Sequence, residues 1–339
     1  MSANLDLTIS VVMPAYNAAH LLRDVLEPPM GMLARGKVCE VIVVDDQSSD
    51  ATAEVASAMG ARVLTTPMNG GPGAARNLAA QQAVGDILWF VDSDVIAWPD
   101  GAAKVRAAMS EDGVAAVFGS YDESPAGTPW FSRYKNLMHR FYHQKADREA
   151  ATFWAGCGAV RADVFRQVGG FDTETYRVPS IEDIELGYRI RSTGRRIVVD
   201  PTLLGKHLKV WTPRTAIFTD IFRRALPWSR LMISREGVAN DLNTSRAERA
   251  KAVIAGAFLV SVLAFVLYPG LWPFMVGLAI FAVLANWKLA RFLYGNGGLM
   301  FAAGSLLYHQ FYYVYSAAAF SWCMFEYHVL GVKDRLHVP

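Results

Sequence analysis

The sequence is poor in cysteine and carries almost no excess of charge. Its three cysteines, Cys39, Cys157 and Cys323, are widely spaced and odd in number. This favours neither disulfides nor a zinc site and agrees with a reducing cytosolic compartment. The formal net charge is +2 and no basic cluster stands out, so we expect no nucleic-acid partner. Residues 1–6 are polar and the first apolar run is only as long as a strand, which predicts no cleavable signal peptide.

The common nucleotide-binding loops are also missing. The stretch 69–77, NGGPGAARN, is rich in glycine but matches neither G-x-G-x-x-G nor a Walker loop. Dinucleotide or ATP binding is therefore not indicated. A glycine-rich turn that opens a helix still permits close backbone approach, and the start of a helix favours anionic groups.

Three apolar runs predict buried parallel strands that deliver polar residues to one edge of a sheet. The runs and the residues that follow them are 7–13 with Pro14 to Asn17, 41–44 with Asp45 and Asp46, and 87–91 with Asp92, Ser93 and Asp94. Helical patterns over 18–26 and 51–59 separate the strands, which predicts an α/β domain with a doubly wound sheet. Ligands of such sheets bind outside the carboxyl ends of the strands, where an Asp-x-Asp pair suits a hard divalent cation.

Seven short motifs in this order resemble those of family 2 glycosyltransferases. They are PAYN, VVDDQSSD, GGPGAARN, FVDSD, FWAGCG, GGFD and IEDIEL. The resemblance covers residues 7–215, about two-thirds of the chain. It implies a GT-A fold, a Rossmann-like α/β domain that binds a nucleotide sugar, and we assign residues 1–211 to this catalytic domain.

On the donor side, the resemblance implies that Asp46 hydrogen-bonds the nucleotide base. A carboxylate acceptor suits the imide N–H of uracil, which favours a UDP-sugar. Pro14, Tyr16 and Asn17 are expected to line the same pocket, although Tyr16 could equally pack on the sheet. Arg76 is expected to point toward the donor and stabilise its phosphates; the alternative is a surface arginine in the first turn of its helix.

The resemblance also implies a divalent cation, Mn²⁺ or Mg²⁺. Asp94 is the candidate for direct contact with the cation, and Asp92 would reach the ribose or a metal-bound water. His207, which follows a predicted strand over 196–199 and a turn at 200–201, is a further candidate ligand. Imidazole suits Mn²⁺ better than Mg²⁺. A purely structural histidine is the alternative.

The acidic stretch 180–186 predicts the start of a helix, where acidic residues are also favoured by the helix dipole. The resemblance implies that Asp183 is the catalytic base, since a carboxylate can accept the proton of an attacking hydroxyl. Glu182 would assist by hydrogen bonding or orientation.

The stretch 151–158 resembles an acceptor-side loop, in which an aromatic ring and small residues shape the cleft. We assign Trp154, Gly156 and Trp211 to the acceptor side. Trp154 could stack on a sugar or lie in the core, and the sequence does not choose between the two.

The composition changes sharply after Lys251. Residues 252–287 contain no charged side chain, and a second uncharged run covers 299–325. Because about 20 apolar residues cross a bilayer, we predict about three membrane segments, near 252–268, 271–287 and 299–325, within a region 251–339. A re-entrant or interfacial third segment and a buried soluble bundle are the alternatives.

Residues 212–250 combine apolar residues at helical spacing with arginines, which predicts amphipathic interfacial helices; a packing helix of the soluble domain is the alternative. Basic residues precede the first apolar segment and follow the second, so both ends favour the cytoplasm. We therefore expect a multi-pass protein of the inner, cytoplasmic membrane with a cytoplasmic catalytic domain.

These expectations combine into an inverting, metal-dependent glycosyltransferase. Its partners would be a nucleotide-sugar donor, a membrane, and a hydroxyl of a lipid or lipid-linked glycan. One alternative is transfer to a polyprenyl phosphate, which is already ionised and needs no base. The other is a non-catalytic membrane protein that uses the fold for nucleotide binding or partner recruitment.

Overall fold

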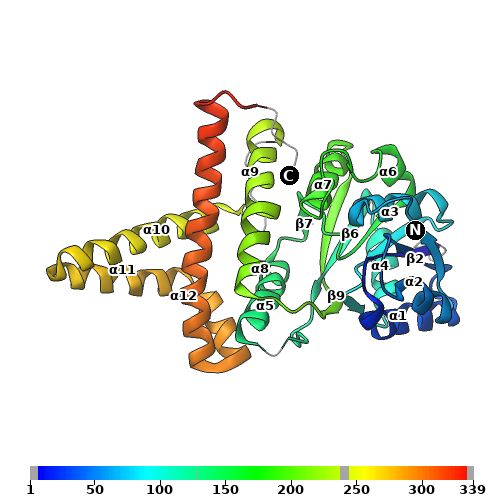
Figure 1. Cartoon of the computed structure of the whole chain (residues 1–339), viewed down its shortest axis with the longest axis horizontal. Helices are drawn as coiled ribbons and strands as arrows, with labels where there is room; N and C mark the ends of the chain where they lie inside the picture. Colours follow the sequence, from blue (N-terminus) through cyan, green and yellow to red (C-terminus); the bar gives the residue numbers. More distant parts are fainter. Residues whose placement is uncertain (1–6, 128, 237–243, 334–339) are drawn as a thin grey trace. The chain divides into compact units, whose positions relative to one another are not determined.

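A computed structural model describes residues 7–127, 129–236 and 244–333 (Figure 1). The described chain divides into two compact units. Of the described residues, the first contains 7–127 and 142–210, and the second contains 129–141, 211–236 and 244–333. Most of the range 1–211 lies in the first unit, whereas residues 129–141 and Trp211 belong to the second; that 1–211 is a catalytic domain stays a prediction.

The first unit is built on one large sheet with strand order β3-β2-β1-β4-β8-β6-β9-β5. Its first half is parallel and consists of β1 (Ile9–Ala15), β2 (Glu40–Asp45), β3 (Arg62–Thr65) and β4 (Ile87–Val91). The helices α1 (Ala19–Ala34), α2 (Thr52–Ala58) and α3 (Gly71–Gln82) connect these strands. This is the β-α series expected from the three apolar runs.

The second half of the sheet is mixed. It consists of β5 (Val95–Ala97), β6 (Val114–Tyr121), β8 (Cys157–Arg161) and β9 (Arg196–His207), and β7 (Glu149–Ala150) pairs with β9. β8 runs antiparallel to both β4 and β6, whereas β6 and β9 are parallel. The helices of this half are α4 (Gly101–Met109), α6 (Ala162–Gln167) and α7 (Glu182–Ser192). The α/β fold class expected from the sequence is confirmed.

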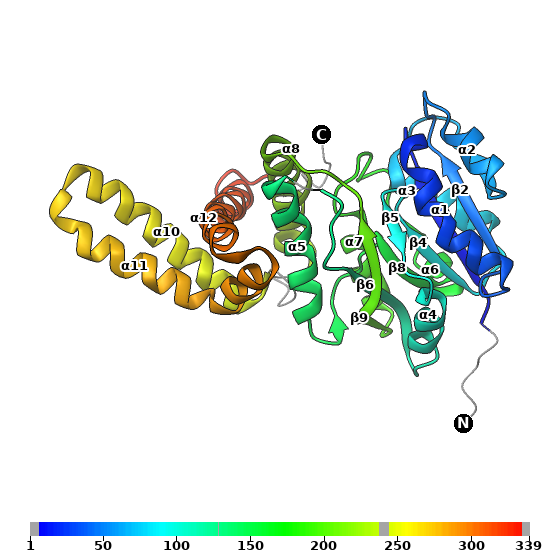
Figure 2. The same ribbon diagram turned by 90° about the horizontal axis from the view of Figure 1, so that it is seen from below.

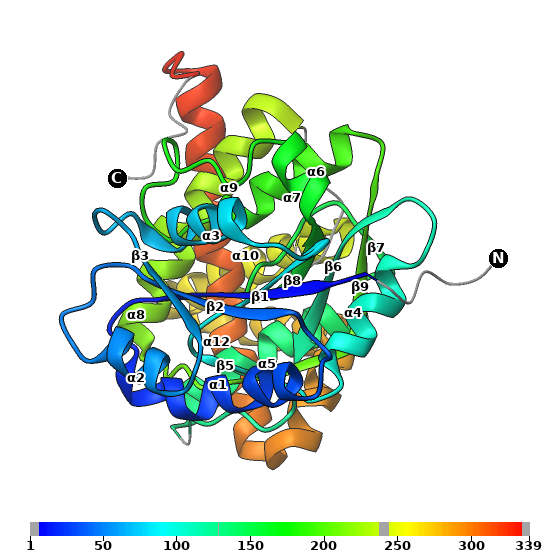
Figure 3. The ribbon, with the colours of Figure 1, turned by 90° about the vertical axis from the view of Figure 1, so that its right-hand side faces the viewer.

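Helices cover both faces of the sheet, as Figure 3 shows. Successive residues of β1 point to opposite faces. Val11 belongs to the same buried cluster as Leu22 of α1 and Val105 of α4, whereas Val12 belongs to a second cluster with Ala75 of α3 and Leu186 of α7. Coverage on both faces explains why the strands read as nearly continuous apolar runs.

The second unit is helical. It contains the first part of α5 (Trp130–Lys145), then α8 (Pro213–Phe218), a π-helical stretch Thr219–Ala225, α9 (Leu226–Leu231) and a second π-helical stretch Met232–Glu236. It continues with α10 (Arg246–Leu267), a short 3₁₀ turn Pro269–Leu271, α11 (Trp272–Ala285) and α12 (Trp287–His328). Figure 2 shows α10 and α11 side by side as a hairpin.

The apolar segments expected near 252–268 and 271–287 are helices α10 and α11, and the segment 299–325 lies inside α12. By length and composition, α10 is the one helix of the described chain that could cross a membrane alone. The segments Pro269–Ala285 and Trp287–His328 pass the same test only as a pair, bent by 76°. One or two spans are therefore supported, not three. Of the predicted interfacial region 212–250, residues 237–243 lie outside the described chain, as do residues 334–339 of the predicted membrane region.

Candidate active site

Two aspartates follow the carboxyl end of β4. Asp92 and Asp94 occupy the turn between β4 and β5, and the pairing of β5 with the end of β9 brings His207 beside them. His207 Nε2 lies 3.5 Å from Asp94 Oδ2. The buried imidazole stacks on the ring of Tyr121, with centroids 4.3 Å apart. β9 runs unbroken through the expected turn at 200–201, and this continuation carries His207 to the site.

The two carboxyl groups differ in their protonation behaviour. Burial, together with the neighbouring Asp94 carboxylate, raises the pKa of Asp92 despite the opposing charge of Arg76. Burial also acts to raise the pKa of Asp94, but the hydrogen bond and charge of His207 and the charge of Lys209 outweigh it, so that this pKa is lowered. Asp94 is therefore the more readily ionised of the pair.

Arg76 lies between the two acidic pairs of the site. It projects from α3, and its side chain is only 4% exposed. One terminal nitrogen donates to Asp92 Oδ1 at 2.5 Å, and the other lies 3.8 Å from Glu182 Oε1. The guanidinium also lies over the ring of Phe171, 5.3 Å from its centroid. The alternative of a surface arginine is therefore wrong.

Glu182 and Asp183 occupy the first turn of α7. Glu182 is buried, and its Oε2 accepts a hydrogen bond from the backbone N–H of Ser180 at 2.8 Å. Burial and the charge of Asp183 raise the pKa of Glu182 to about 7. The partly exposed Asp183 carboxylate accepts from the backbone N–H groups of Ala155 at 3.1 Å and of Ile184 at 2.9 Å. These contacts hold the carboxylate in one orientation.

Asp46 holds the glycine-rich turn in place. Its Oδ1 accepts from the Thr66 hydroxyl at 2.7 Å and from the backbone N–H of Gly70 at 3.0 Å, and its Oδ2 accepts from the N–H of Gly71 at 2.7 Å. A carboxylate offers about four acceptor positions, so about one remains for a ligand. That Asp46 hydrogen-bonds the nucleotide base stays a prediction. In addition, Asp46 stabilises the glycine-rich turn, a role that the sequence did not indicate.

The other predicted nucleotide-pocket residues differ in accessibility. Pro14 is buried within β1, whereas the Tyr16 side chain is 55% exposed just beyond the strand. Asn17 has a left-handed backbone conformation, with φ +50°, and its Oδ1 accepts from the backbone N–H of Ser49 at 2.8 Å. The backbone N–H of Asn17 donates to the Ser48 hydroxyl at 2.9 Å, so that Asn17 fixes the loop that carries Asp46 and Ser48.

The acceptor-side assignments fall in different units. In the first unit, Trp154 is half-buried against the core, and its ring meets Tyr121 edge-on at 4.9 Å. Gly156 allows this position, because a Cβ there would lie 2.7 Å from the indole of Trp154. Trp211 belongs to the second unit, where it is buried and its indole N–H donates to Asn136 at 3.2 Å.

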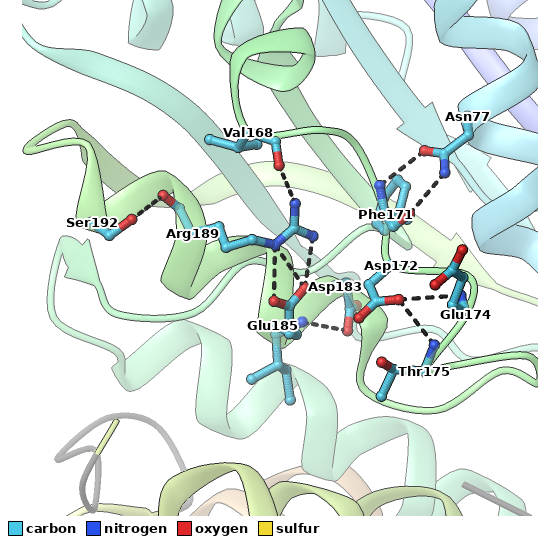
Figure 4. Close-up of polar contacts among 11 residues, drawn as sticks. Asn77, Val168, Phe171, Asp172, Glu174, Thr175, Asp183, Glu185, Arg189 and Ser192 are labelled. Atoms are coloured by element: carbon cyan, nitrogen blue, oxygen red, sulfur yellow. Dashed lines mark hydrogen bonds and ion pairs between the residues drawn. The ribbon is translucent and has the colours of Figure 1, made fainter. Parts of the chain in front are cut away.

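Asn77 is a site-supporting residue that the sequence did not single out. Its side chain donates to the carbonyl of Phe171 at 2.8 Å and accepts from the N–H of the same residue at 2.9 Å (Figure 4). In the same view, Glu185 is paired with Arg189 at 2.6 Å on the same helix, α7. The two hydrogen bonds of Asn77 to Phe171, which we call the Asn77 clasp, join residues that are 94 positions apart in the chain. No local sequence pattern could therefore have revealed them.

The residues present fit part of a cation site. Two ligand atoms that bind one ion at about 2.1 Å and at right angles lie about 3 Å apart, close to the separation of Asp94 and His207. Asp92 is engaged by Arg76. Within residues 7–127, 129–236 and 244–333, no three histidine, cysteine or acidic side chains are grouped closely enough to hold a metal. The remaining ligands of a cation must therefore come from bound substrate or water.

Comparison with known proteins places this site in context. Residues 10–169 match the model of the family "Glycosyl transferase family 2". A probable glycosyltransferase, YdaM, of Bacillus subtilis is 24% identical over 239 residues, which are 66% of this chain and 54% of the relative. Glucosyl-3-phosphoglycerate synthase of Mycobacterium tuberculosis is 42% identical over 98 residues, 26% of this chain and 29% of the relative. The chain spans about half the length, or less, of the curated relatives it matches.

Among solved structures, the mannosyltransferase PcManGT of Pyrobaculum calidifontis, in complex with GDP-Man and Mn²⁺, is 18% identical. The match covers 95% of this chain and 91% of that one, with a TM-score of 0.49. At this level of similarity the match carries no argument about ligands of the present chain.

Proposed function

This chain belongs to glycosyl transferase family 2, and we propose that it transfers a sugar from a nucleoside-diphosphate donor, with inversion, to a hydroxyl of a lipid or lipid-linked glycan. One observation carries the proposal. Arg76 contacts both Asp92 and Glu182, so that the expected donor-side carboxylates and the expected base, Asp183, belong to one connected cluster. A fold retained only for binding would not need this second acidic pair.

On the donor side, the nucleotide would lie beyond the ends of β1, β2 and β4. The remaining acceptor position of Asp46 suits an imide N–H and hence a uridine nucleotide. The exposed ring of Tyr16 is available for stacking on the base or ribose. A UDP-sugar is therefore the favoured donor.

Asp94 and His207 would hold a divalent cation, and the imidazole favours Mn²⁺ over Mg²⁺. When bound, the cation would offset negative charge on the diphosphate leaving group. Arg76 holds Asp92 beside this position by a hydrogen bond, where the carboxylate can accept from the ribose or from a metal-bound water. Tyr121 fixes the plane of the imidazole by stacking.

Asp183 would act as the general base. It takes the proton from the acceptor hydroxyl while the hydroxyl oxygen forms a bond to the anomeric carbon from the face opposite the leaving group. The bond between that carbon and the diphosphate oxygen breaks, and the nucleoside diphosphate leaves. The backbone donors of Ala155 and Ile184 orient the carboxylate for this role.

The helical unit supports a lipid-borne acceptor. α10 is long and apolar enough to cross a bilayer, and only 11% of its apolar window is buried. An enzyme held at a membrane, with its catalytic domain in the cytosol where nucleotide sugars are made, meets lipid-borne acceptors readily. We therefore assign the acceptor to a lipid or lipid-linked glycan at the cytoplasmic face of the inner membrane.

The proposal is tested by transfer with detergent-solubilised protein. Donor hydrolysis and transfer are measured across a panel of nucleotide sugars, with Mn²⁺ or Mg²⁺ and a total lipid extract. The Asp183→Asn variant is expected to lose about 10²- to 10⁴-fold in transfer rate, the usual contribution of a general base, while its donor affinity stays unchanged. Asp163→Asn, at an exposed aspartate of α6, is the matched control and should retain the full rate.

The outcomes separate the alternatives. A metal-dependent glycolipid product that the wild type forms and Asp183→Asn does not supports transfer to a hydroxyl. Full turnover by Asp183→Asn would overturn the base assignment and indicate an acceptor that is already ionised, such as a polyprenyl phosphate. Absence of binding to every donor would overturn the enzymatic proposal.

A further inference from the structure

The hairpin of α10 and α11 has the features of a segment that enters a bilayer and returns to the same side. We propose that it is a re-entrant hairpin whose tip, residues 268–273, stays inside the hydrocarbon layer. This inference depends on one part of the proposed function, namely that the protein works at a membrane. In place of two complete crossings, the hairpin would enter the bilayer from the side that carries the basic residues and return to that side.

The whole of α10 has 22 residues and is long enough to cross a bilayer, but its first six residues include four charged ones. The uncharged arms of the hairpin are shorter than α10 as a whole. The uncharged part of α10 covers residues 252–267, and α11 covers 14 residues, Trp272–Ala285. At about 1.5 Å per residue, the arms reach about 24 Å and 21 Å, whereas the hydrocarbon core is about 30 Å thick. The tip therefore passes the centre of the bilayer but stops short of the opposite headgroups.

The backbone of the tip forms several hydrogen bonds of its own. Tyr268 N–H donates to Ala264 at 2.8 Å, Leu271 N–H donates to Tyr268 at 3.0 Å, and Trp272 N–H donates to Pro269. Pro269 and Pro273 have no N–H to satisfy. Irregular backbone is costly in lipid because its polar groups lack partners, and these three hydrogen bonds lower that cost at the tip.

The outer surface of the hairpin is apolar over much of its circumference. Its large exposed side chains are Val253, Leu259, Val260, Leu263, Val266, Leu267, Tyr268, Leu271, Trp272, Phe274, Val276, Ile280, Phe281, Val283 and Leu284. At about 100° per residue, those of α11 cover more than half of that helix. A protein partner would cover one stripe, whereas lipid surrounds the arms on several sides, so the occupant we infer is the bilayer.

The open end of the hairpin is polar and anchored. The buried Glu248 of α10 accepts from the Tyr313 hydroxyl of α12 at 2.5 Å, and the same hydroxyl donates to Asn286, just after α11, at 3.1 Å. These two hydrogen bonds connect both arms to α12 at the open end of the hairpin. Five basic residues lie close in sequence to this end: Arg246, Arg249, Lys251, Lys288 and Arg291. Basic residues at the interface complement anionic lipid headgroups.

The depth of the tip can be tested by cysteine accessibility in the full-length protein. Gly270→Cys is expressed in a bacterial inner membrane and exposed to a membrane-impermeant maleimide, in right-side-out spheroplasts and in inverted vesicles. We expect labelling from neither side but complete labelling after SDS denaturation. Gly270 has open space around its Cα, so the substitution disturbs no packing. The parent protein, labelled in parallel, gives the background from the three native cysteines.

Trp287→Cys, at the open end of the hairpin, is the matched control and should be labelled from one side only. Labelling of Gly270→Cys in intact spheroplasts would overturn the proposal in favour of two complete crossings. Labelling in inverted vesicles would place the tip in water and would overturn the proposal as well. Trp272→Cys provides a second tip position if the first variant does not accumulate. Donor binding by the same vesicles reports on the proposed function separately.

Discussion

The bridging arginine gives the most direct test of how the site is held together. In Arg76→Met, the methionine keeps much of the apolar volume but removes the charge that Asp92 and Glu182 share. Asp92 would then face the charge of Asp94, and Glu182 that of Asp183, with less compensation. We expect the variant to fold less stably and to bind donor poorly.

The expected magnitude follows from burial. Arg76 and Glu182 have side chains that are 4% and 8% exposed, whereas that of Asp92 is 34% exposed. Removing one partner of a fully buried ion pair costs about 3–5 kcal/mol. Because water reaches Asp92 and the contact with Glu182 is longer, we expect about 3 kcal/mol, the lower end of that range.

The free energy of unfolding is measured by urea titration in detergent, followed by circular dichroism. Adding Glu182→Gln to Arg76→Met should restore about 1 kcal/mol, since it removes one uncompensated carboxylate. Arg148→Met is the control, because Arg148 pairs with Glu111 at the surface and should cost less than about 1 kcal/mol. A loss in Arg76→Met no larger than in this control would refute the reasoning.

Two further predictions concern the pH dependence of stability and the packing of the sheet. Because the pKa of Glu182 is about 7 in the folded protein, above the ordinary glutamate value of 4.5 that applies to the unfolded chain, the folded state holds the extra proton between these values. The free energy of unfolding should therefore fall as the pH rises from 4.5 to 7. In urea titrations of Glu182→Gln this fall should be smaller. An equal dependence of the unfolding free energy on pH in both proteins would contradict the raised pKa of Glu182. A Cβ at Gly119 would lie 2.0 Å from the carbonyl oxygen of Leu203, so Gly119→Ala should cost more than about 3 kcal/mol or prevent folding. In the same assay the helical Gly31→Ala should be neutral or gain up to about 1 kcal/mol, and equal stability of the two alanine variants would argue against the close approach of β6 and β9.

The roles of the loop residues illustrate how one side chain can serve the fold and the site together. The carboxylate of Asp46 accepts from both glycines that open α3, and Asn77 of the same helix clasps Phe171. α3 thus lies between the loop expected to bind the nucleotide and the segment that leads to Asp183. A change at Asp46 should be interpreted with this structural role in mind, since it would loosen the turn as well as remove a ligand.

Much of the first unit was determined by the sequence alone. Continuous apolar runs such as 41–44 and 87–91 indicate strands buried on both faces, which requires covering helices and hence an α/β sheet. Acidic residues at the ends of such runs must lie at one edge. The motif order then linked that edge to Asp183, and the length of uncharged sequence after Lys251 predicted apolar helices.

The tertiary structure decided what pairs with what. Whether Arg76 faced solvent or the site depended on Glu182, which lies over 100 positions further along the chain, and the Asn77 clasp depended on a loop equally remote. Local patterns carry no information about such contacts, because they arise only when distant segments pack. The number of membrane crossings was likewise set by helix lengths and by the bend before α12, whereas hydropathy recorded only that residues 252–287 lack charge. The composition determines which segments avoid water, but the three-dimensional path of the backbone determines how far each apolar segment extends as a helix.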